Sequence, residues 1–199
     1  SKLEVDRRRV RTRIQALRAE IAVVRQRRHQ LRERRHKRDT PTVALVGYTN
    51  AGKTTLFNRL TGGDAVASDA LFVTLDPLVR RVRLPDAREM LVSDTVGFIE
   101  RLPHALVAAF AATLEEVVDA DLVLHVIDAS NPAFRDQVTA VEGVLAELGA
   151  VDVPSIKVFN KVDRLTPEHA DRLAQTEPTA VLLSARLGTG LDQIGRAHV

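Results

Sequence analysis

The stretch Gly47-Tyr-Thr-Asn-Ala-Gly-Lys-Thr54 decides the fold, because it follows the apolar run Val43–Val46 and opens a helical pattern over Lys53–Leu60. Its glycines let backbone N–H groups turn inward around phosphate oxygens. This strand–loop–helix context predicts a P-loop, in which Lys53 supplies charge to the β- and γ-phosphates and the Thr54 hydroxyl ligates Mg²⁺. We assign phosphate contacts to the whole loop: Gly47, Tyr48, Thr49, Asn50, Ala51, Gly52, Lys53, Thr54 and Thr55.

Outward from this loop, short apolar runs alternate with helical stretches, which indicates a parallel sheet covered by helices on both faces. We expect strands at Val43–Val46, Leu78–Leu84, Met90–Ser93, Leu122–Ile127, Ile156–Phe159 and Ala180–Leu183. We expect helices at Lys53–Leu60, Ala105–Val118, Phe134–Leu148, Glu168–Ala174 and after Gly190. A tight turn at Pro85–Arg88 makes the second and third strands antiparallel. The predicted class is α/β, with a six-stranded, mainly parallel sheet containing one antiparallel strand.

A second motif, Asn160-Lys-Val-Asp163, directly follows the strand expected at Ile156–Phe159, at the edge where such sheets bind ligands. The Asp163 carboxylate can accept from the ring N–H and the exocyclic amino group of guanine, two donors that adenine does not present on that edge. A polar turn is the alternative, and the P-loop upstream disfavours it. The base contacts are assigned to Asn160, Lys161, Asp163, Ser184, Ala185 and Arg186, with the Ala185 N–H facing the guanine oxygen.

The third motif, Asp94-Thr-Val-Gly97, follows the expected strand Met90–Ser93. Asp94 can hold the Mg²⁺ shell through water, and the Gly97 N–H can meet the γ-phosphate. Thr74, in the loop that also carries Phe72, is the candidate for a second Mg²⁺-ligating hydroxyl. Phe72, Thr74, Asp94 and Gly97 therefore join the nucleotide contacts, the metal ligands are Thr54 and Thr74, and the catalytic group is Lys53, Thr74 and Gly97.

The amino-terminal segment differs sharply in charge from the rest of the chain. Residues 1–38 hold 15 Lys/Arg against 4 Asp/Glu, and residues 39–199 hold 14 against 22. Its apolar positions recur at alternating steps of four and three, which predicts a long basic helix with a heptad seam: Val10, Ile14, Leu17, Ile21 and Val24. We therefore divide the chain into a basic linker helix, 1–39, and a nucleotide-binding domain, 40–199.

Composition excludes several other classes of protein. The chain of 199 residues is 45% hydrophobic and has no cysteine, so it can bury a core but has no disulfide, thiolate zinc site or thiol nucleophile. No apolar run reaches the roughly 18 residues that a membrane-spanning helix needs, and the six histidines lack ligand spacing. We expect a cytoplasmic protein, and a chain that is part of a longer one.

Four stretches resemble the HflX family of ribosome-associated GTPases: the P-loop from Gly47, Thr-Leu-Asp-Pro from 74, Asp-Thr-Val-Gly-Phe-Ile from 94 and Leu-Glu-Val-Asp-Arg-Arg-Arg from 3. The resemblance covers the whole chain. It implies a Ras-like P-loop GTPase domain that binds GTP and GDP with Mg²⁺, preceded by a linker helix and, in the family, an amino-terminal domain. It further implies the large ribosomal subunit and its RNA as partner, with a role in separating stalled or stressed ribosomes.

Two residues bear on the rate of hydrolysis. Phe98 follows Gly97 where Ras-like GTPases carry a glutamine that orients the attacking water, so intrinsic GTP hydrolysis should be slow. Asn50 leaves two interpretations open: an asparagine that helps to hold a K⁺ acting like an arginine finger, and an asparagine that stabilises the turn.

Two functions from different classes remain open on sequence alone. The first is a GTPase that acts as a nucleotide-dependent switch on the large ribosomal subunit. The second is an RNA-binding helical module in which the nucleotide mainly orders the fold, favoured by the net charge of +11 on residues 1–38. Two roles of the helix also remain open: its apolar seam packs on another helix or self-associates, or its basic face contacts RNA directly. The two roles need not exclude each other.

Overall fold

The computed structural model describes residues 10–16, 19, 40–65, 78–84, 87–95, 97–98 and 114–196. The chain divides into two compact units, Ser1–Thr40 and Pro41–Val199. In the first unit, residues 10–16 and 19 are helical, and the side chains of Val10 and Ile14 are 58% and 43% exposed. The other seam positions, Leu17, Ile21 and Val24, lie outside the described residues.

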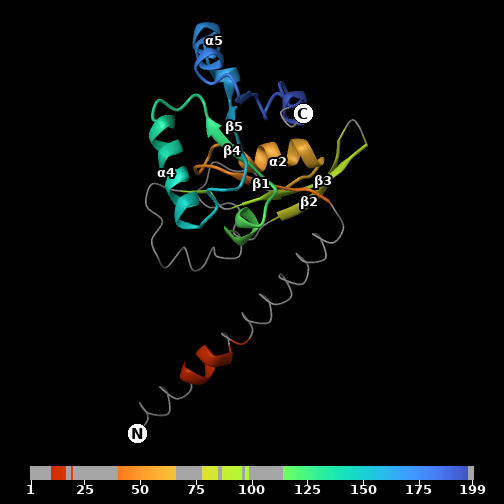
Figure 1. Cartoon of the computed structure of the whole chain (residues 1–199), viewed down its shortest axis with the longest axis vertical. Helices are drawn as coiled ribbons and strands as arrows, with labels where there is room; N and C mark the ends of the chain where they lie inside the picture. The colour runs from red at the N-terminus through yellow and green to blue at the C-terminus, as the bar shows by residue number, and fades with distance from the viewer. Residues whose placement is uncertain are drawn as a thin grey trace. The chain divides into compact units, whose positions relative to one another are not determined.

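The second unit is built on a six-stranded sheet in the order β2-β3-β1-β4-β5-β6 (Figure 1). Only the β2–β3 pair is antiparallel, and the other neighbours are parallel. This confirms the predicted fold class, including the hairpin. The strands are β1 (Thr42–Val46), β2 (Leu78–Arg83), β3 (Glu89–Asp94), β4 (Leu122–Asp128), β5 (Ser155–Asn160) and β6 (Val181–Leu182).

The expected strand Ala180–Leu183 is longer than the observed β6. Leu183 N–H still donates to Phe159 O at 2.9 Å, but Ser184 pairs instead with Thr189, to whose carbonyl its N–H donates at 3.0 Å. The chain therefore leaves β5 at this point and enters a turn.

The helices match the expected positions. They are α2 (Lys53–Thr61), α4 (Phe134–Glu147), α5 (Pro167–Thr176) and α6 (Asp192–Arg196), with a 3₁₀ turn η1 at Val162–Arg164. Helix α5 begins where the Thr166 side chain accepts from the His169 N–H and a proline occupies the first turn. Of the helix expected at Ala105–Val118, the structure describes residues 114–118, which are helical.

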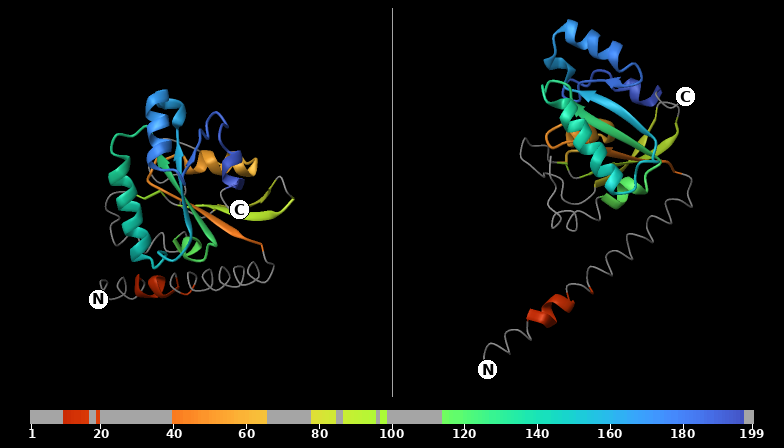
Figure 2. Two further views of the ribbon diagram at one scale, coloured as in Figure 1. Left: turned by 45° about the horizontal axis from the view of Figure 1, so that its top comes forward. Right: turned by 60° about the vertical axis from the view of Figure 1, so that its left-hand side comes forward.

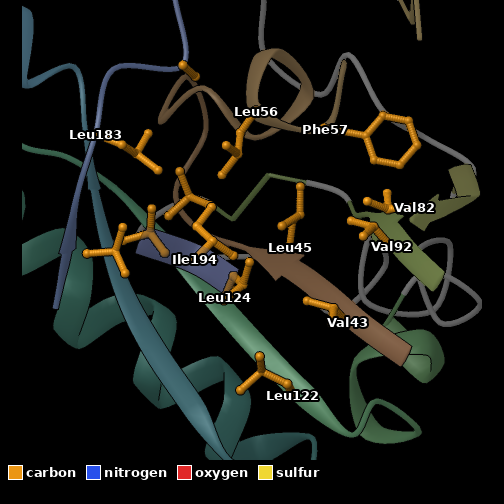
Figure 3. Close-up of a cluster of buried hydrophobic side chains, with 14 of the residues drawn as sticks. Val43, Leu45, Leu56, Phe57, Val82, Val92, Leu122, Leu124, Leu183 and Ile194 are labelled. Carbon is orange, nitrogen blue, oxygen red and sulfur yellow. The ribbon is translucent and has the colours of Figure 1, made fainter. Parts of the chain in front are cut away.

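Helices cover both faces of the sheet (Figure 2), and alternate strand residues enter separate cores. On the face covered by α2 and α6, Val43 and Leu45 of β1 pack with Leu56, Phe57 and Ile194, as Figure 3 shows. On the other face, Ala44 and Val46 join a cluster that contains Phe98, Leu114, Val117, Val141 and Leu145. Because β1 is apolar on both faces, it is buried between the two helical layers.

The parallel strands β1, β3, β4 and β5 end at one edge of the sheet. The chain crosses from β3 on one side of β1 to β4 on the other, and such a switch point opens a crevice at the carboxyl ends of the strands. Asp94, Asp128 and Asn160, the last residues of β3, β4 and β5, lie at this edge. Among the residues that the structure describes, no helix has the length and apolar character needed to cross a membrane.

Candidate nucleotide-binding site

The loop between β1 and α2 has a backbone that side chains at its glycines would obstruct. Gly47 has φ 153°, and a Cβ there would lie 2.2 Å from the Val126 carbonyl oxygen. Gly52 has φ 93°, and a Cβ there would lie 2.3 Å from Asn160 Nδ2. Both glycines are therefore required by close approach of the loop to β4 and β5, as in a loop that wraps around phosphate.

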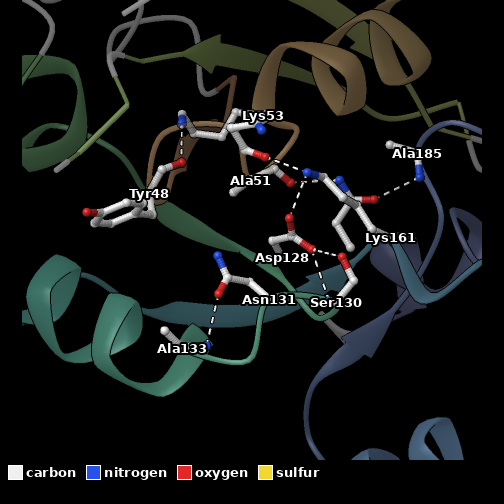
Figure 4. A network of polar contacts seen from close by, with 11 residues as sticks. Tyr48, Ala51, Lys53, Asp128, Ser130, Asn131, Ala133, Lys161 and Ala185 are labelled. Atoms are coloured by element: carbon white, nitrogen blue, oxygen red, sulfur yellow. Dashed lines mark hydrogen bonds and ion pairs between the residues drawn. The ribbon is translucent and has the colours of Figure 1, made fainter. Parts of the chain in front are cut away.

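Lys53, in the first turn of α2, is buried and folds back over this loop. Its Nζ donates to the carbonyl oxygens of Gly47 at 3.1 Å and Tyr48 at 3.0 Å, the second bond being drawn in Figure 4. Burial lowers the pKa of Lys53 to about 8, and the nearby Asp94 carboxylate opposes that shift. Among the described residues, the hydrogen bonds of this buried ammonium go to neutral carbonyl oxygens, so it would gain from an anion such as a phosphate.

Thr54 and Asp94 bring two oxygen ligands together at the end of β3. The Thr54 hydroxyl donates to Asp94 Oδ2 at 2.7 Å, and Asp94 is fully buried. A hydroxyl and a carboxylate are ligands of the kind that Mg²⁺ prefers, so these residues fit that ion. The other proposed ligand, Thr74, lies with Phe72 outside the described residues.

The segment after β3 is fastened to the phosphate loop by main-chain bonds. Phe98 N–H donates to Gly47 O at 3.1 Å, and Thr49 N–H donates to Phe98 O at 2.7 Å. A Cβ at Gly97 would lie 3.1 Å from Lys53 Nζ, so Gly97 lies close to the Lys53 ammonium. The Phe98 ring is fully buried in the cluster that contains Val141 and Leu145 of α4, here called the α4-side core. Sequence reasoning noted only that Phe98 replaces a glutamine and missed this anchoring role.

Asn160, at the end of β5, connects the phosphate loop to the loop after β6. Its Nδ2 donates to Ala51 O at 2.9 Å, and its Oδ1 accepts from Ala185 N–H at 2.9 Å. The Ala185 N–H that the sequence assigns to the guanine oxygen is therefore bonded to Asn160 in this structure. Both loops share one buried amide, which fixes the spacing between the two assigned subsites.

Lys161 and Asp128 form a largely covered ion pair beside Asn160 (Figure 4). Lys161 Nζ lies 2.7 Å from Asp128 Oδ2 and donates to Asn50 O at 2.6 Å. Ser130 supplies an N–H at 3.0 Å and a hydroxyl at 2.6 Å to the other Asp128 oxygen. Sequence reasoning missed Asp128, although its position at the carboxyl end of β4, in register with Asn160, was a usable signal.

Asp163 lies in η1 and is held by the loop after β6. It accepts from Ser184 Oγ at 2.6 Å and from the Arg186 guanidinium at 2.8 Å. The Ser184 hydroxyl, and after it the Arg186 charge, lower the pKa of Asp163 against the opposing effect of burial. Its side chain is 7% exposed, whereas that of Arg186 is 68% exposed. The carboxylate is therefore ionised, and its outer partner, the Arg186 guanidinium, is largely exposed to solvent.

The candidate residues that the structure describes thus gather at one edge of the sheet, from Gly47 in the phosphate loop to Arg186 after β6. The family described as "50S ribosome-binding GTPase" matches residues 42–161, which span the phosphate loop and Asn160. Among solved structures, Era in complex with MgGDPNP and nucleotides 1506–1542 of 16S ribosomal RNA is 25% identical with a TM-score of 0.61, over 79% of this chain and 55% of that one.

Two curated relatives match almost the whole chain. The GTPase HflX of Caldanaerobacter subterraneus subsp. tengcongensis is 48% identical over 98% of this chain and 44% of its own length. The GTPase HflX of Escherichia coli K12 is 47% identical over 99% of this chain and 47% of its own length. The chain spans about half the length of these relatives. It belongs to the family of 50S ribosome-binding GTPases and, within it, to the HflX GTPases.

Proposed function

We propose that the chain binds GTP and hydrolyses it to GDP and phosphate. The observation that carries this proposal is the bridging role of Asn160, whose amide bonds Ala51 in the phosphate loop and Ala185 in the loop after β6, here called the base loop. One buried side chain thereby sets the distance between a phosphate subsite and a guanine subsite. Asp163 supplies selectivity, because its ionised carboxylate accepts from two guanine donors once Arg186 moves aside.

The chain's own residues do two things for hydrolysis. Lys53 places its ammonium against the β- and γ-phosphates and stabilises the charge that develops there, and the Gly97 N–H donates to the γ-phosphate. Mg²⁺, when bound, neutralises charge between the phosphates, and Thr54 and Thr74 would hold it. Phe98 is buried and has no group that can orient water, so unassisted turnover is slow.

Two roles for Asn50 remain open: helping to hold a K⁺ and stabilising the turn. Its backbone conformation and its contact favour the turn-stabilising role. Its φ is 60°, a left-handed conformation that asparagine tolerates better than most residues, and its carbonyl accepts from Lys161. A turn-stabilising role accounts for both facts, and a K⁺ site at Asn50 is the second hypothesis.

The partner we propose is the large ribosomal subunit with its RNA, on which the GTP-bound form acts as a switch that separates stalled or stressed ribosomes in the cytoplasm. The description of the matched family supports this partner. A switch fits the fold, because Gly97 and Phe98 lie against the phosphate loop, where a γ-phosphate would be sensed.

A second candidate function is favoured by the basic segment, which we propose as a separate linker helix over residues 1–39. Its net charge of +11 over residues 1–38 suits RNA phosphates. The exposed Val10 and Ile14 suit instead an apolar partner, such as the same helix of a second copy. If the helix acts as an RNA-binding module, the bound nucleotide would mainly order the GTPase domain.

GTP turnover, measured with and without purified large ribosomal subunits, tests the proposal. We expect slow turnover alone, clear stimulation by large subunits, and loss of both in Lys53→Ala. Binding to ribosomal RNA compared between the GTP and GDP forms separates the two functions. RNA affinity that ignores the nucleotide, together with turnover that ignores large subunits, would favour the RNA-binding module.

A further inference from the structure

Arg59 forms a contact that the mechanism above does not use. It lies in the last turn of α2, the helix whose first turn carries Lys53. Its guanidinium donates from Nε to Ala185 O at 2.9 Å and from Nη2 to Arg186 O at 2.6 Å. One side chain thus bonds two successive carbonyl groups of the base loop, 126 and 127 residues away in sequence.

This geometry fixes the orientation of a peptide group. The unit between Ala185 and Arg186 is planar, so holding the Ala185 carbonyl toward α2 points the Arg186 N–H the opposite way. A guanidinium is a rigid fork, and two bonds from it to adjacent carbonyls restrict rotation more than one bond from a flexible ammonium does. Arg59 therefore limits how the main chain at 185–186 can turn.

Other residues hold the same loop from different sides. Asn160 accepts from the Ala185 N–H, and the Ser184 hydroxyl and the Arg186 side chain both bond Asp163. Among the hydrogen bonds of the described residues, Arg59 is the residue of α2 that bonds the base loop. The helix that begins at the phosphate loop thereby also supports the base loop at its other end.

We propose that Arg59 is a positioning residue for the part of the site that binds the 6-oxygen of guanine. This rests on the proposed function, because it assumes that the Arg186 N–H donates to the base, in place of the Ala185 N–H that is bonded to Asn160. Arg59 does not touch the nucleotide and acts through the two carbonyl groups. Because the Arg59 side chain is exposed, its loss should leave the fold intact. Removing it should weaken GDP binding roughly tenfold, about the effect of one charge-assisted hydrogen bond.

The test uses the full chain with three substitutions. Arg59→Met keeps the aliphatic stem and removes the donors, and Arg59→Lys restores one donor group. Arg172→Met is the matched control, since Arg172 is an exposed arginine on α5. Each protein is titrated with GDP, with 6-thio-GDP, which weakens the acceptor at position 6, and with IDP, which lacks the 2-amino group facing Asp163. Thermal unfolding without nucleotide checks the fold.

We expect Arg59→Met to bind GDP roughly tenfold more weakly, with Arg59→Lys intermediate and Arg172→Met unchanged. In Arg59→Met the affinity penalty for 6-thio-GDP should shrink, whereas the penalty for IDP should stay as in wild type. Unchanged GDP affinity, or equal changes in both penalties, would overturn the role of Arg59 while leaving GTP binding intact. A wild-type chain that fails to bind GDP would instead overturn the proposed function.

Discussion

The proposed guanine side of the site and the proposed phosphate side differ in what satisfies their polar groups before a ligand arrives. On the guanine side, Asp163 is already bonded to a hydroxyl and a guanidinium. On the phosphate side, the buried Lys53 ammonium is bonded to neutral carbonyl oxygens. The base must therefore exchange existing hydrogen bonds, while a phosphate meets an incompletely compensated charge. Affinity should come mainly from the phosphate side, and selectivity from the guanine side.

The largest effect should follow from breaking the anchor of the phosphate side. Phe98→Ala removes a fully buried ring from the α4-side core and should lower the free energy of unfolding by about 3 to 5 kcal/mol. Phe98→Leu, which fills more of the space, should cost less. Urea unfolding of both variants without nucleotide measures this, and an Ala variant as stable as wild type would contradict the anchoring role.

Lys53→Met separates affinity from stability. Losing a buried charge opposite phosphate should cost about 2 to 5 kcal/mol of GTP binding free energy. The free protein should be at least as stable as wild type near pH 7, because burial already disfavours the Lys53 charge and lowers its pKa to about 8. Calorimetric titration and urea unfolding give the two values. A Lys53→Met variant that loses stability but keeps its GTP affinity would contradict the view that the phosphate side supplies most of the affinity.

Acid should destabilise the sheet beneath the phosphate loop through His125. Burial, with the charges of Lys157 and Lys53, lowers the pKa of His125 to about 4 from an ordinary 6.5. Between these values the unfolded chain binds more protons, so stability falls as pH falls, by about 2 kcal/mol at pH 5. Urea unfolding at pH 7 and pH 5 should show this loss of stability in the wild-type protein but not in His125→Gln. Equal pH dependence in both proteins would rule it out.

The smallest effect should come from the outer partner of Asp163. The Arg186 side chain is 68% exposed, so its ion pair is worth at most about 1 kcal/mol. Because guanine must displace it, Arg186→Ala should bind GDP up to roughly fivefold more tightly. Weaker GDP binding by Arg186→Ala would show that this side chain contacts the nucleotide rather than competing with it.

Local patterns predicted most of the fold, since each strand and helix has its own apolar period. The apolar run Val43–Val46 and the turn at Pro85–Arg88 were enough to predict the first strand and the antiparallel pair, whereas the strand order came from the structure. The P-loop spacing likewise brought Lys53 and Thr54 to the edge of the sheet, where Asp94 also lies. Apolar runs, turns and motif spacing depend on residues that are close in sequence, so they can be recognised from one sequence alone.

Contacts between distant segments could not be predicted in this way. The bonds from Arg59 to the loop at 185–186 and from Lys161 to Asp128 join residues whose sequence separation carries no periodic signal. Glu116 illustrates the same limit: beside Glu115 it suggests a solvated helix face, yet it is buried. Burial is decided by what packs against a helix, and the charge pattern of one helix does not contain that information.

The central claim is that the chain selects guanine through the Asp163 carboxylate, and titration of Asp163→Asn with GTP and XTP tests it most directly. An amide opposes a donor to the guanine N–H and suits xanthine instead, so GTP binding should weaken by about 1 to 3 kcal/mol, the scale of a bidentate base contact. XTP should then bind the variant better than GTP does. Unchanged GTP affinity with no gain for XTP would contradict the assignment of Asp163 and the guanine selectivity built on it.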